Sequence, residues 1–159
     1  MKITALEEYG LRCLLQLART AGGEKKEGLS ISDIAKREGL SIEYVSKITA
    51  HLKKVGLVEA IRGVHGGYRL IQKPTETKLS DIARALGNPL FDSGFCGEHA
   101  GKEDACVHEE NCAIRSVWNV VYKHVNEILD QITLADLLIE EGRMKERLLS
   151  LVEGEKVYL

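Results

Sequence analysis

The sequence predicts a mainly α-helical chain with a small β-hairpin, built as a winged helix-turn-helix followed by a long dimerisation helix. Three observations predict this class: two short capped helices around a tight turn, two alternating strands around a glycine-rich turn, and a late helix with coiled-coil spacing. The expected divisions are residues 1–78 for the winged helix-turn-helix, 79–112 for a short helix and a cysteine-bearing loop, and 113–159 for the dimerisation helix and a C-terminal helix.

The N-terminal segment follows helical spacing. Residues 3–19 are expected to form a helix, because Leu6, Cys13 and Leu17 share one apolar stripe. Since Cys13 lies on that stripe, we interpret it as a core thiol. A polar, glycine-rich connector at 21–28 then leads to two short helices.

Serines and glycines mark the ends of these two helices. Ser30 or Ser32 can cap the first helix, which Gly39 ends. Ser41 can cap the second helix, which Gly56 ends. Two helices joined by so tight a turn are the helix-turn-helix pattern.

A β-hairpin is expected next. Strands at 57–61 and 68–71 alternate in polarity on either side of the glycine-rich turn "RGVHGG". Three helices followed by a hairpin are the element order of a winged helix. A short helix capped near Ser80 and ending at Leu86 follows, and the cysteine-bearing loop comes after it.

The helix after Cys112 carries a long apolar seam. Its members step by 3, 4, 4, 3 and 4 residues, which is the spacing of a coiled coil. A lone helix of this kind needs a partner to cover its stripe, and a homodimer is the simplest one, with packing back onto the same chain as the alternative. Thr133 can cap a last helix. The seam consists of Ile114, Val117, Val121, Val125, Ile128 and Ile132, widened by Trp118 and Leu129.

Composition limits the classes of function. Hydrophobic residues make up 44% and charged residues 29%, and the apolar runs are far shorter than the ~20 residues that cross a bilayer. Glu7 and Glu8 stand where a signal peptide would be apolar, so a cytoplasmic protein without membrane association is expected. The sequence offers no Ser-His-Asp set, phosphate loop or paired carboxylates, so we expect no enzyme activity.

Charge is segregated along the chain. Eight Lys and Arg stand against three Glu from Lys36 to Lys73, whereas six acidic residues stand against Lys102 alone from Asp92 to Cys112. This asymmetry favours one surface for an anionic polymer and another for a different partner. Two oppositely charged solvated faces would give the same counts.

The second short helix is the candidate reader of DNA. The polar side chains on its outer face suit base edges in a major groove, and the lysines near its end suit phosphates. Arg62 heads the glycine turn, which suits insertion into a minor groove. The alternative for each residue is an ordinary solvated side chain. The candidate contacts with double-stranded DNA are Glu43, Tyr44, Ser46, Lys47, Lys53, Lys54 and Arg62.

Three of the four cysteines lie close together, because Cys96, Cys106 and Cys112 are spaced C-x9-C-x5-C. A disulfide would leave one thiol over and suits an oxidising compartment. Three thiolates on one loop can converge on an iron–sulfur cluster, or on zinc if His99 or His108 completes a Cys3His set. Plain thiols are the third alternative, and the spacing alone leaves all three open.

Nearly the whole chain resembles one protein family. The stretch "SIEYVSKITAHLKKVGLVEAIRGVHGGYRL", with "MKITALEEYGLRCLLQLA" before it and "TLADLL" after it, resembles the bacterial winged-helix regulators that include IscR, NsrR, RirA and CymR. The resemblance implies homodimers on near-palindromic operators, with a long helix crossing between the subunits. By position it implies base contacts near Glu43, Ser46 and Lys47 and a minor-groove role for Arg62.

The resemblance also implies that Cys96, Cys106 and Cys112 ligate an iron–sulfur cluster. The chain keeps the five-residue second gap that is usual in the metal-sensing members and lengthens the first gap by four residues. Where IscR-like proteins carry a ligand histidine, this chain has Arg115. NsrR-like members use an acidic side chain from the first helix of the other subunit, which implies Glu8 as the fourth ligand. The rival candidates are Glu7, Glu59, His99 and His108.

Together these features predict a homodimeric transcriptional regulator whose operator affinity is set by an iron–sulfur cluster, with [2Fe–2S] preferred over [4Fe–4S]. The signal would be iron, cluster supply, nitric oxide or redox state. Two alternatives keep the DNA binding without the cluster. One is a zinc- or thiol-based repressor, and the other is a regulator controlled by docking on an enzyme of sulfur metabolism.

Overall fold

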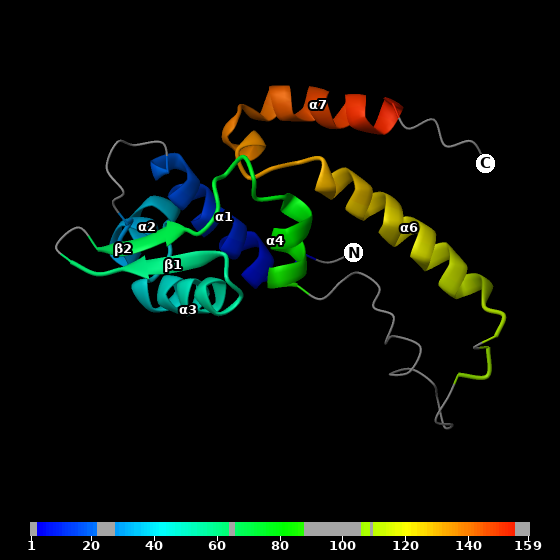
Figure 1. Ribbon diagram of the computed structural model, residues 1–159, viewed down its shortest axis with the longest axis horizontal. Coiled ribbons are helices and arrows are strands. Elements are labelled where there is room, and N and C mark those ends of the chain that lie inside the picture. The colour runs from blue at the N-terminus through cyan, green and yellow to red at the C-terminus, as the bar shows by residue number, and fades with distance from the viewer. Residues whose placement is uncertain (1–2, 22–27, 64–65, 88–105, 109, 155–159) are drawn as a thin grey trace.

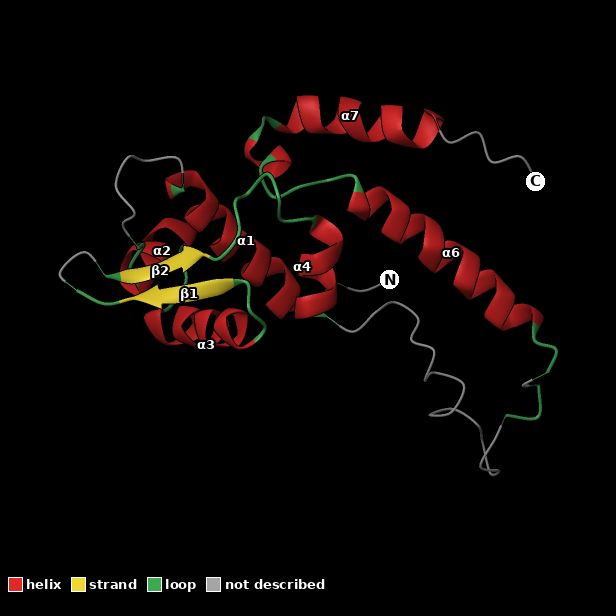
Figure 2. Cartoon of the chain, in the orientation of Figure 1, coloured by secondary structure: helices red, strands yellow, loops and turns green. Residues whose placement is uncertain are grey.

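The computed structural model describes residues 3–21, 28–63, 66–87, 106–108 and 110–154 (Figure 1). These residues are mostly helical and carry a two-stranded antiparallel hairpin, which confirms the fold class predicted from the sequence (Figure 2). The elements in chain order are α1 (Ala5–Thr20), α2 (Ile31–Glu38), α3 (Ile42–Lys54), β1 (Val58–Ile61), β2 (Gly67–Leu70), α4 (Leu79–Leu86), α6 (Ala113–Asp130), the 3-10 turn η1 (Asp136–Leu138) and α7 (Glu141–Gly154).

The first four helices and the hairpin gather into one body (Figure 1). In the same view α6 extends away from this body, and α7 leaves the region where α6 ends. The candidate DNA-reading elements and the candidate dimerisation helix therefore occupy separate parts of the chain.

Side-chain caps start the first three helices. Thr4 and Glu7 form a capping box on α1, in which the Thr4 N–H donates to Glu7 Oε2 at 2.7 Å and the Glu7 N–H donates to Thr4 Oγ1 at 3.2 Å. Ser30 caps α2 and Ser41 caps α3, in agreement with the sequence. Gly39 ends α2 with φ of 66°, a left-handed conformation that suits glycine.

The hairpin is joined to the body by a pairing that the sequence did not predict. Val58 pairs with Leu70 and Ile61 with Gly67 across the two strands. On the outer side of β2, Leu29 and Tyr68 exchange two backbone hydrogen bonds of 2.9 Å each, so Leu29 acts as a one-residue third strand. The turn residues 64–65 lie outside the described residues.

The core lies between α1, α2, α3 and α4 and is aliphatic. Cys13 is fully buried in it, which confirms its interpretation as a core thiol, and burial raises the pKa of Cys13 to about 11. The largest fully buried side chains include Leu14, Leu17, Ile34, Ile48, Leu52, Ile82 and Leu134.

The expected cap at Ser80 is wrong. Lys78 stands at the N-cap of α4 and supplies no side-chain hydrogen bond. Ser80 is buried instead, and its hydroxyl donates to Oδ1 of Asp130 at the end of α6. The serine therefore joins two helices rather than starting one.

The prediction of one last helix from Thr133 is also wrong, because this part of the chain forms two elements, η1 and α7. The Thr133 N–H and hydroxyl both donate to Oδ2 of Asp136, the first residue of η1, at 2.8 Å, and neither bond reaches α7. Burial acts to raise the pKa of Asp136, but these bonds and the charge of Arg147 lower it overall. Ile132 lies beyond the end of α6 and is buried, so it belongs to the core rather than to the seam.

Candidate nucleic-acid interface and cysteine segment

Helix α3 turns one side to the core and the other to solvent. Val45, Ile48 and Leu52 are buried, and Thr49 is turned inward with its hydroxyl donating to the Val45 carbonyl oxygen at 2.9 Å. The opposite side carries one exposed apolar residue, Ile42, at its start, and beyond it the side is polar or small. Its other exposed residues are Glu43, Ser46, Lys47, Ala50, Lys53 and Lys54.

Tyr44 differs from the other predicted DNA contacts because its ring is half-buried. It packs edge to face against Tyr9 of α1, with ring centroids 5.6 Å apart. Of the predicted contacts on α3, the structure thus brings Glu43, Ser46 and Lys47 together on the outer face and places Tyr44 at its edge, against α1.

A polar network fixes the first two helices to each other. Arg12 Nε donates to Glu38 Oε2 at 2.6 Å, and Arg12 Nη2 donates to the Glu38 carbonyl oxygen at 3.1 Å. Gln16 Nε2 also donates to the Glu38 carboxylate. The hydrogen bond to Glu38 raises the pKa of Arg12, so the pair stays ionised. Sequence reasoning missed these residues, although Tyr9, Arg12 and Gln16 recur at helical spacing.

Arg62 is exposed at the start of the wing turn. Arg62 follows the last residue of β1 and precedes Gly63, whose φ of 121° is accessible to glycine and strained for other residues. Further down the hairpin, Arg69 Nε lies 2.7 Å from Glu59 Oε1 across the two strands. Glu59, a rival candidate for the fourth cluster ligand, is therefore engaged in the hairpin.

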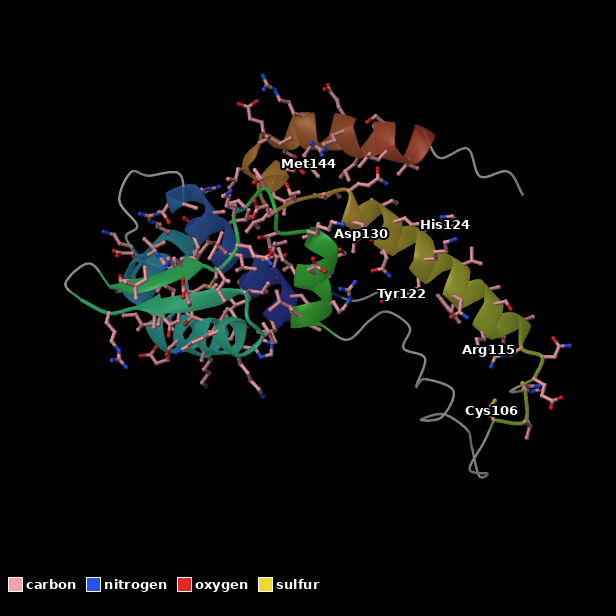
Figure 3. All side chains as sticks on the ribbon, in the orientation of Figure 1. Cys106, Arg115, Tyr122, His124, Asp130 and Met144 are labelled. Atoms are coloured by element: carbon pink, nitrogen blue, oxygen red, sulfur yellow. The ribbon has the colours of Figure 1, made fainter. Side chains whose placement is uncertain are left out.

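The cysteine segment is described only in part. Cys96 and His99 lie outside the described residues, whereas Cys106 and Cys112 are half-buried free thiols. Within the described ranges, no three His, Cys, Asp or Glu side chains gather closely enough to hold a metal ion. Figure 3 places Cys106 beside the end of α6 that carries Arg115, away from the winged-helix body.

Cys112 occupies a special position at the N-cap of α6. Its Sγ accepts the backbone N–H of Arg115 at 3.4 Å. This hydrogen bond fixes the position of the Cys112 sulfur at the start of α6.

The candidate carboxylate ligands on α1 differ in their surroundings. The Glu7 carboxylate is held by the capping box, and it also lies against Gly87, where α4 ends. Glu8 is exposed, and its carboxylate makes no hydrogen bond or ion pair within the described residues. His108 in the cysteine segment is also exposed.

The predicted seam of α6 is largely open to solvent. Ile114, Val117 and Val121 are 69%, 60% and 45% exposed, and Trp118 is 49% exposed. Val125 and Ile128 are half-buried towards the end that meets α4. An apolar stripe exposed over several turns marks an interaction surface. As for membranes, no helix in the described part of the chain is long and apolar enough to span one.

Comparison with known proteins finds a matching family profile and similar sequences. The Rrf2 family profile, described as an iron-dependent transcriptional regulator, matches residues 3–140. NsrR of Geobacillus kaustophilus is 32% identical over 148 residues, which are 93% of this chain and 97% of that protein.

Two solved structures extend this comparison. The structure of IscR of T. potens matches with a TM-score of 0.66 and 35% identity, covering 87% of this chain and 86% of that one. The structure of CymR, described as the global cysteine regulator of B. subtilis, matches with a TM-score of 0.67 and 31% identity, covering 86% and 95%.

Proposed function

Because the chain belongs to the Rrf2 family of transcriptional regulators, we propose that it is a homodimeric DNA-binding regulator whose operator affinity is controlled by an iron–sulfur cluster held by Cys96, Cys106 and Cys112. The family identifies a regulator rather than an enzyme. The observation that carries the proposal is the separation of three surfaces along one chain. They are the polar face of α3, the exposed seam of α6, and the thiols at the start of α6.

Duplex DNA is the proposed partner of α3. The helix is capped at Ser41 and braced from behind by the core, so its polar face is held rigidly towards solvent. Lys53 and Lys54 at its end suit phosphates, and Arg62 at the wing suits the adjacent minor groove. A near-palindromic operator follows from two-fold symmetry of the proposed dimer.

A second copy of the chain is the proposed cover of the α6 seam. The helix has 18 residues and is therefore about 27 Å long, and its apolar stripe would be unstable in water alone. Pairing of two α6 seams would bury Ile114, Val117 and Val121. It would also fix the distance between the two α3 helices, which must be about 34 Å to reach successive major grooves.

The described cysteines fit a cluster. Cys106 and Cys112 are free thiols, and Cys112 receives an N–H hydrogen bond at a helix N-terminus. Such hydrogen bonds to sulfur also tune cluster potentials. When bound, the cluster would supply sensitivity to iron, oxidation or nitric oxide. The residues of this chain would hold it at the start of the dimerisation helix, where a change in loop position alters the spacing of the α3 helices.

Glu8, contributed by the second protomer, is the proposed fourth ligand. Glu7 is engaged by the capping box and Glu59 by Arg69, whereas Glu8 is exposed. A carboxylate holds iron less tightly than a thiolate, which suits a sensor that must lose or change its cluster. His108 is the competing ligand within the described residues, since it is also exposed.

Anaerobic purification tests the cluster directly. We expect a coloured protein with matched iron and sulfide, and Mössbauer spectra should decide between [2Fe–2S] and [4Fe–4S]. Glu8→Ala should make the cluster more labile, whereas Glu110→Ala, which removes an exposed carboxylate inside the cysteine segment, should leave it unchanged. A colourless protein that contains zinc, or that stays empty after reconstitution, would contradict the cluster proposal.

A further inference from the structure

Glu43 and Lys47 stand on the outer face of α3, one helical turn apart. Residues at positions i and i+4 share a face, and their separation along the helix axis is about 6 Å. Both side chains are exposed, and neither makes a hydrogen bond or ion pair within the described residues. Both charged groups are therefore available to a partner of α3.

The charge of Glu43 is unusual in its surroundings. Three glutamates accompany eight Lys and Arg between Lys36 and Lys73. Glu38 is neutralised by Arg12, and Glu59 is neutralised by Arg69. Glu43 is the glutamate of this segment that remains without such a cation in the described structure, and it faces the proposed DNA. Next to phosphates an unpaired carboxylate weakens binding, unless it accepts a hydrogen bond from a base.

The donors and acceptors of the bases decide which base fits a carboxylate. In the major groove guanine presents two acceptors and thymine presents an acceptor and a methyl group, so both repel or fail to bind a carboxylate. Adenine presents a donor beside an acceptor. Cytosine presents the N4 amino group alone and therefore fits Glu43 best. A lysine is donor-only, and O6 and N7 of guanine are its matching acceptors.

The orientation of α3 is fixed at the N-terminal end of the helix. The Ser41 hydroxyl accepts the N–H of Tyr44 at 3.2 Å, and the ring of Tyr44, the residue after Glu43, packs against Tyr9 of α1. A charged side chain on so constrained a turn can discriminate bases, because a wrong base cannot be accommodated by rotating the helix. Ser46 lies on the same face, and its hydroxyl both donates and accepts, so it selects bases less strongly.

We propose that α3 reads two G·C pairs in each operator half-site, with Glu43 selecting a cytosine and Lys47 selecting a guanine one or two base-pair steps away. The spacing follows from the ~6 Å between the two positions along the helix and the ~3.4 Å between base pairs. The inference rests on the proposed DNA binding by α3 and adds the class of sequence that is bound.

Selection from a random duplex library tests the proposal, with the full chain used in both its cluster-loaded and cluster-free forms. We expect both enriched half-sites to contain two G·C pairs at most two steps apart. Replacing the C·G pair that contains the cytosine selected by Glu43 with a T·A pair should weaken binding about five- to hundredfold. Glu43→Ala should abolish the preference at that pair alone and strengthen binding to unrelated duplexes. Lys47→Ala should abolish the preference at the guanine.

Lys53→Ala is the matched control, because it removes a charge from the same helix face at the phosphate-facing end. It should weaken binding to all sequences alike. Positions 43, 47 and 53 are all exposed, so the three alanine variants should have the same urea-unfolding midpoint as the unsubstituted chain. Equal midpoints exclude misfolding as the cause of a change in binding.

The outcomes separate the inference from the function on which it rests. If specific half-sites are enriched but Glu43→Ala leaves every base preference unchanged, the base assignment is wrong and DNA binding stands. Enriched half-sites without the two G·C pairs would have the same meaning. If neither form of the protein enriches any duplex, DNA binding through α3 is wrong, and the base assignment is wrong with it.

Discussion

The ring of Tyr9 in α1 meets the ring of Tyr44 in α3 edge to face, with ring centroids 5.6 Å apart and ring planes at 81°. The guanidinium carbon of Arg12 lies 5.3 Å from the centroid of the same Tyr9 ring, and Arg12 is also bonded to Glu38 at the end of α2. Tyr9 and Arg12 together therefore connect the first helix to both helices of the helix-turn-helix. A perturbation of α1 would reach the proposed DNA-binding face of α3 through this contact.

Tyr9→Ala should lower the free energy of unfolding by about 1–3 kcal/mol. About 0.5–1.5 kcal/mol of this comes from the aromatic pair, and the remainder comes from lost packing around Arg12 and Tyr44. Tyr9→Phe keeps the ring and is the matched control, so it should remain close to the unsubstituted protein. Urea unfolding measures both variants. Equal losses for the two would show that the hydroxyl, and not the ring contact, carries the stability.

Gly67→Ala should destabilise the wing more than Gly63→Ala. Gly67 has φ of 150°, and a Cβ there would lie 2.5 Å from the Leu29 carbonyl oxygen, which bonds the N–H of Tyr68. Gly63 has φ of 121°, and a Cβ there would meet no atom within 4 Å. Both substitutions introduce backbone strain of about 1–3 kcal/mol, but only Gly67→Ala must also displace the Leu29 bridge.

Hydrogen exchange distinguishes the two glycine variants. The Leu29 and Tyr68 amides donate to each other's carbonyls, so they should lose protection in Gly67→Ala and keep it in Gly63→Ala. Unchanged protection in Gly67→Ala would mean that the strand shifts without breaking the bridge.

Local signals predicted the winged helix correctly. Ser30 and Ser41 cap helices, and Gly39 ends one in a left-handed conformation, because caps and turns depend on residues within one turn of the chain. The outer face of α3 was also predictable, since helical periodicity alone decides which residues share a side.

Long-range contacts explain what the sequence did not reveal. Serine is a residue type that commonly caps helices, but the hydroxyl of Ser80 donates to Asp130, fifty positions away in the chain. The bonds from Arg12 and Gln16 to Glu38 and the pairing of Leu29 with Tyr68 likewise depend on the packed fold. Glu43 stands out as the glutamate without a cation only once the structure shows that Glu38 pairs with Arg12 and Glu59 with Arg69.

Cys13 predicts a specific loss of stability at alkaline pH. Burial raises the pKa of Cys13 to about 11 from the ordinary thiol value of 9.0, so the folded protein keeps a proton that the unfolded chain releases between these values. The contribution of Cys13 to stability is thus fully present below about pH 9 and is lost as pH rises towards 11, by at most about 1.4 kcal/mol per pH unit.

The Cys13→Ala variant isolates this titration from that of other groups. It lacks the thiol, so its free energy of unfolding should fall less steeply than that of the unsubstituted protein between pH 9 and pH 11. Urea unfolding across this range measures the difference in slope. Parallel pH profiles for the two proteins would contradict a raised thiol pKa.

A charge on the α6 seam should dissociate the proposed dimer. Val117 and Val121 are exposed in the single chain and would be buried between two seams. Glutamate at either position would place an unpaired carboxylate in an apolar interface and should raise the dimer dissociation constant at least about 100-fold. Asn119→Glu is the matched control, because position 119 is exposed on the same helix but lies off the seam. Analytical ultracentrifugation gives the masses, and an unsubstituted chain that sediments as a monomer would contradict the dimer.

The salt dependence of DNA binding should report on Lys53 and Lys54. Both side chains are exposed at the end of α3, where the helix would approach phosphates. Each phosphate contact adds about 0.9 to the slope of log affinity against log salt concentration. Replacing both lysines by alanine removes two contacts per protomer, so the slope for a bound dimer should fall by up to about 3.6, while the base preferences stay unchanged. Lys145→Ala, which removes an exposed charge from α7, should leave the slope as it is. If the double variant binds more weakly with an unaltered slope, the lysines act through the structure of α3 and not through phosphates.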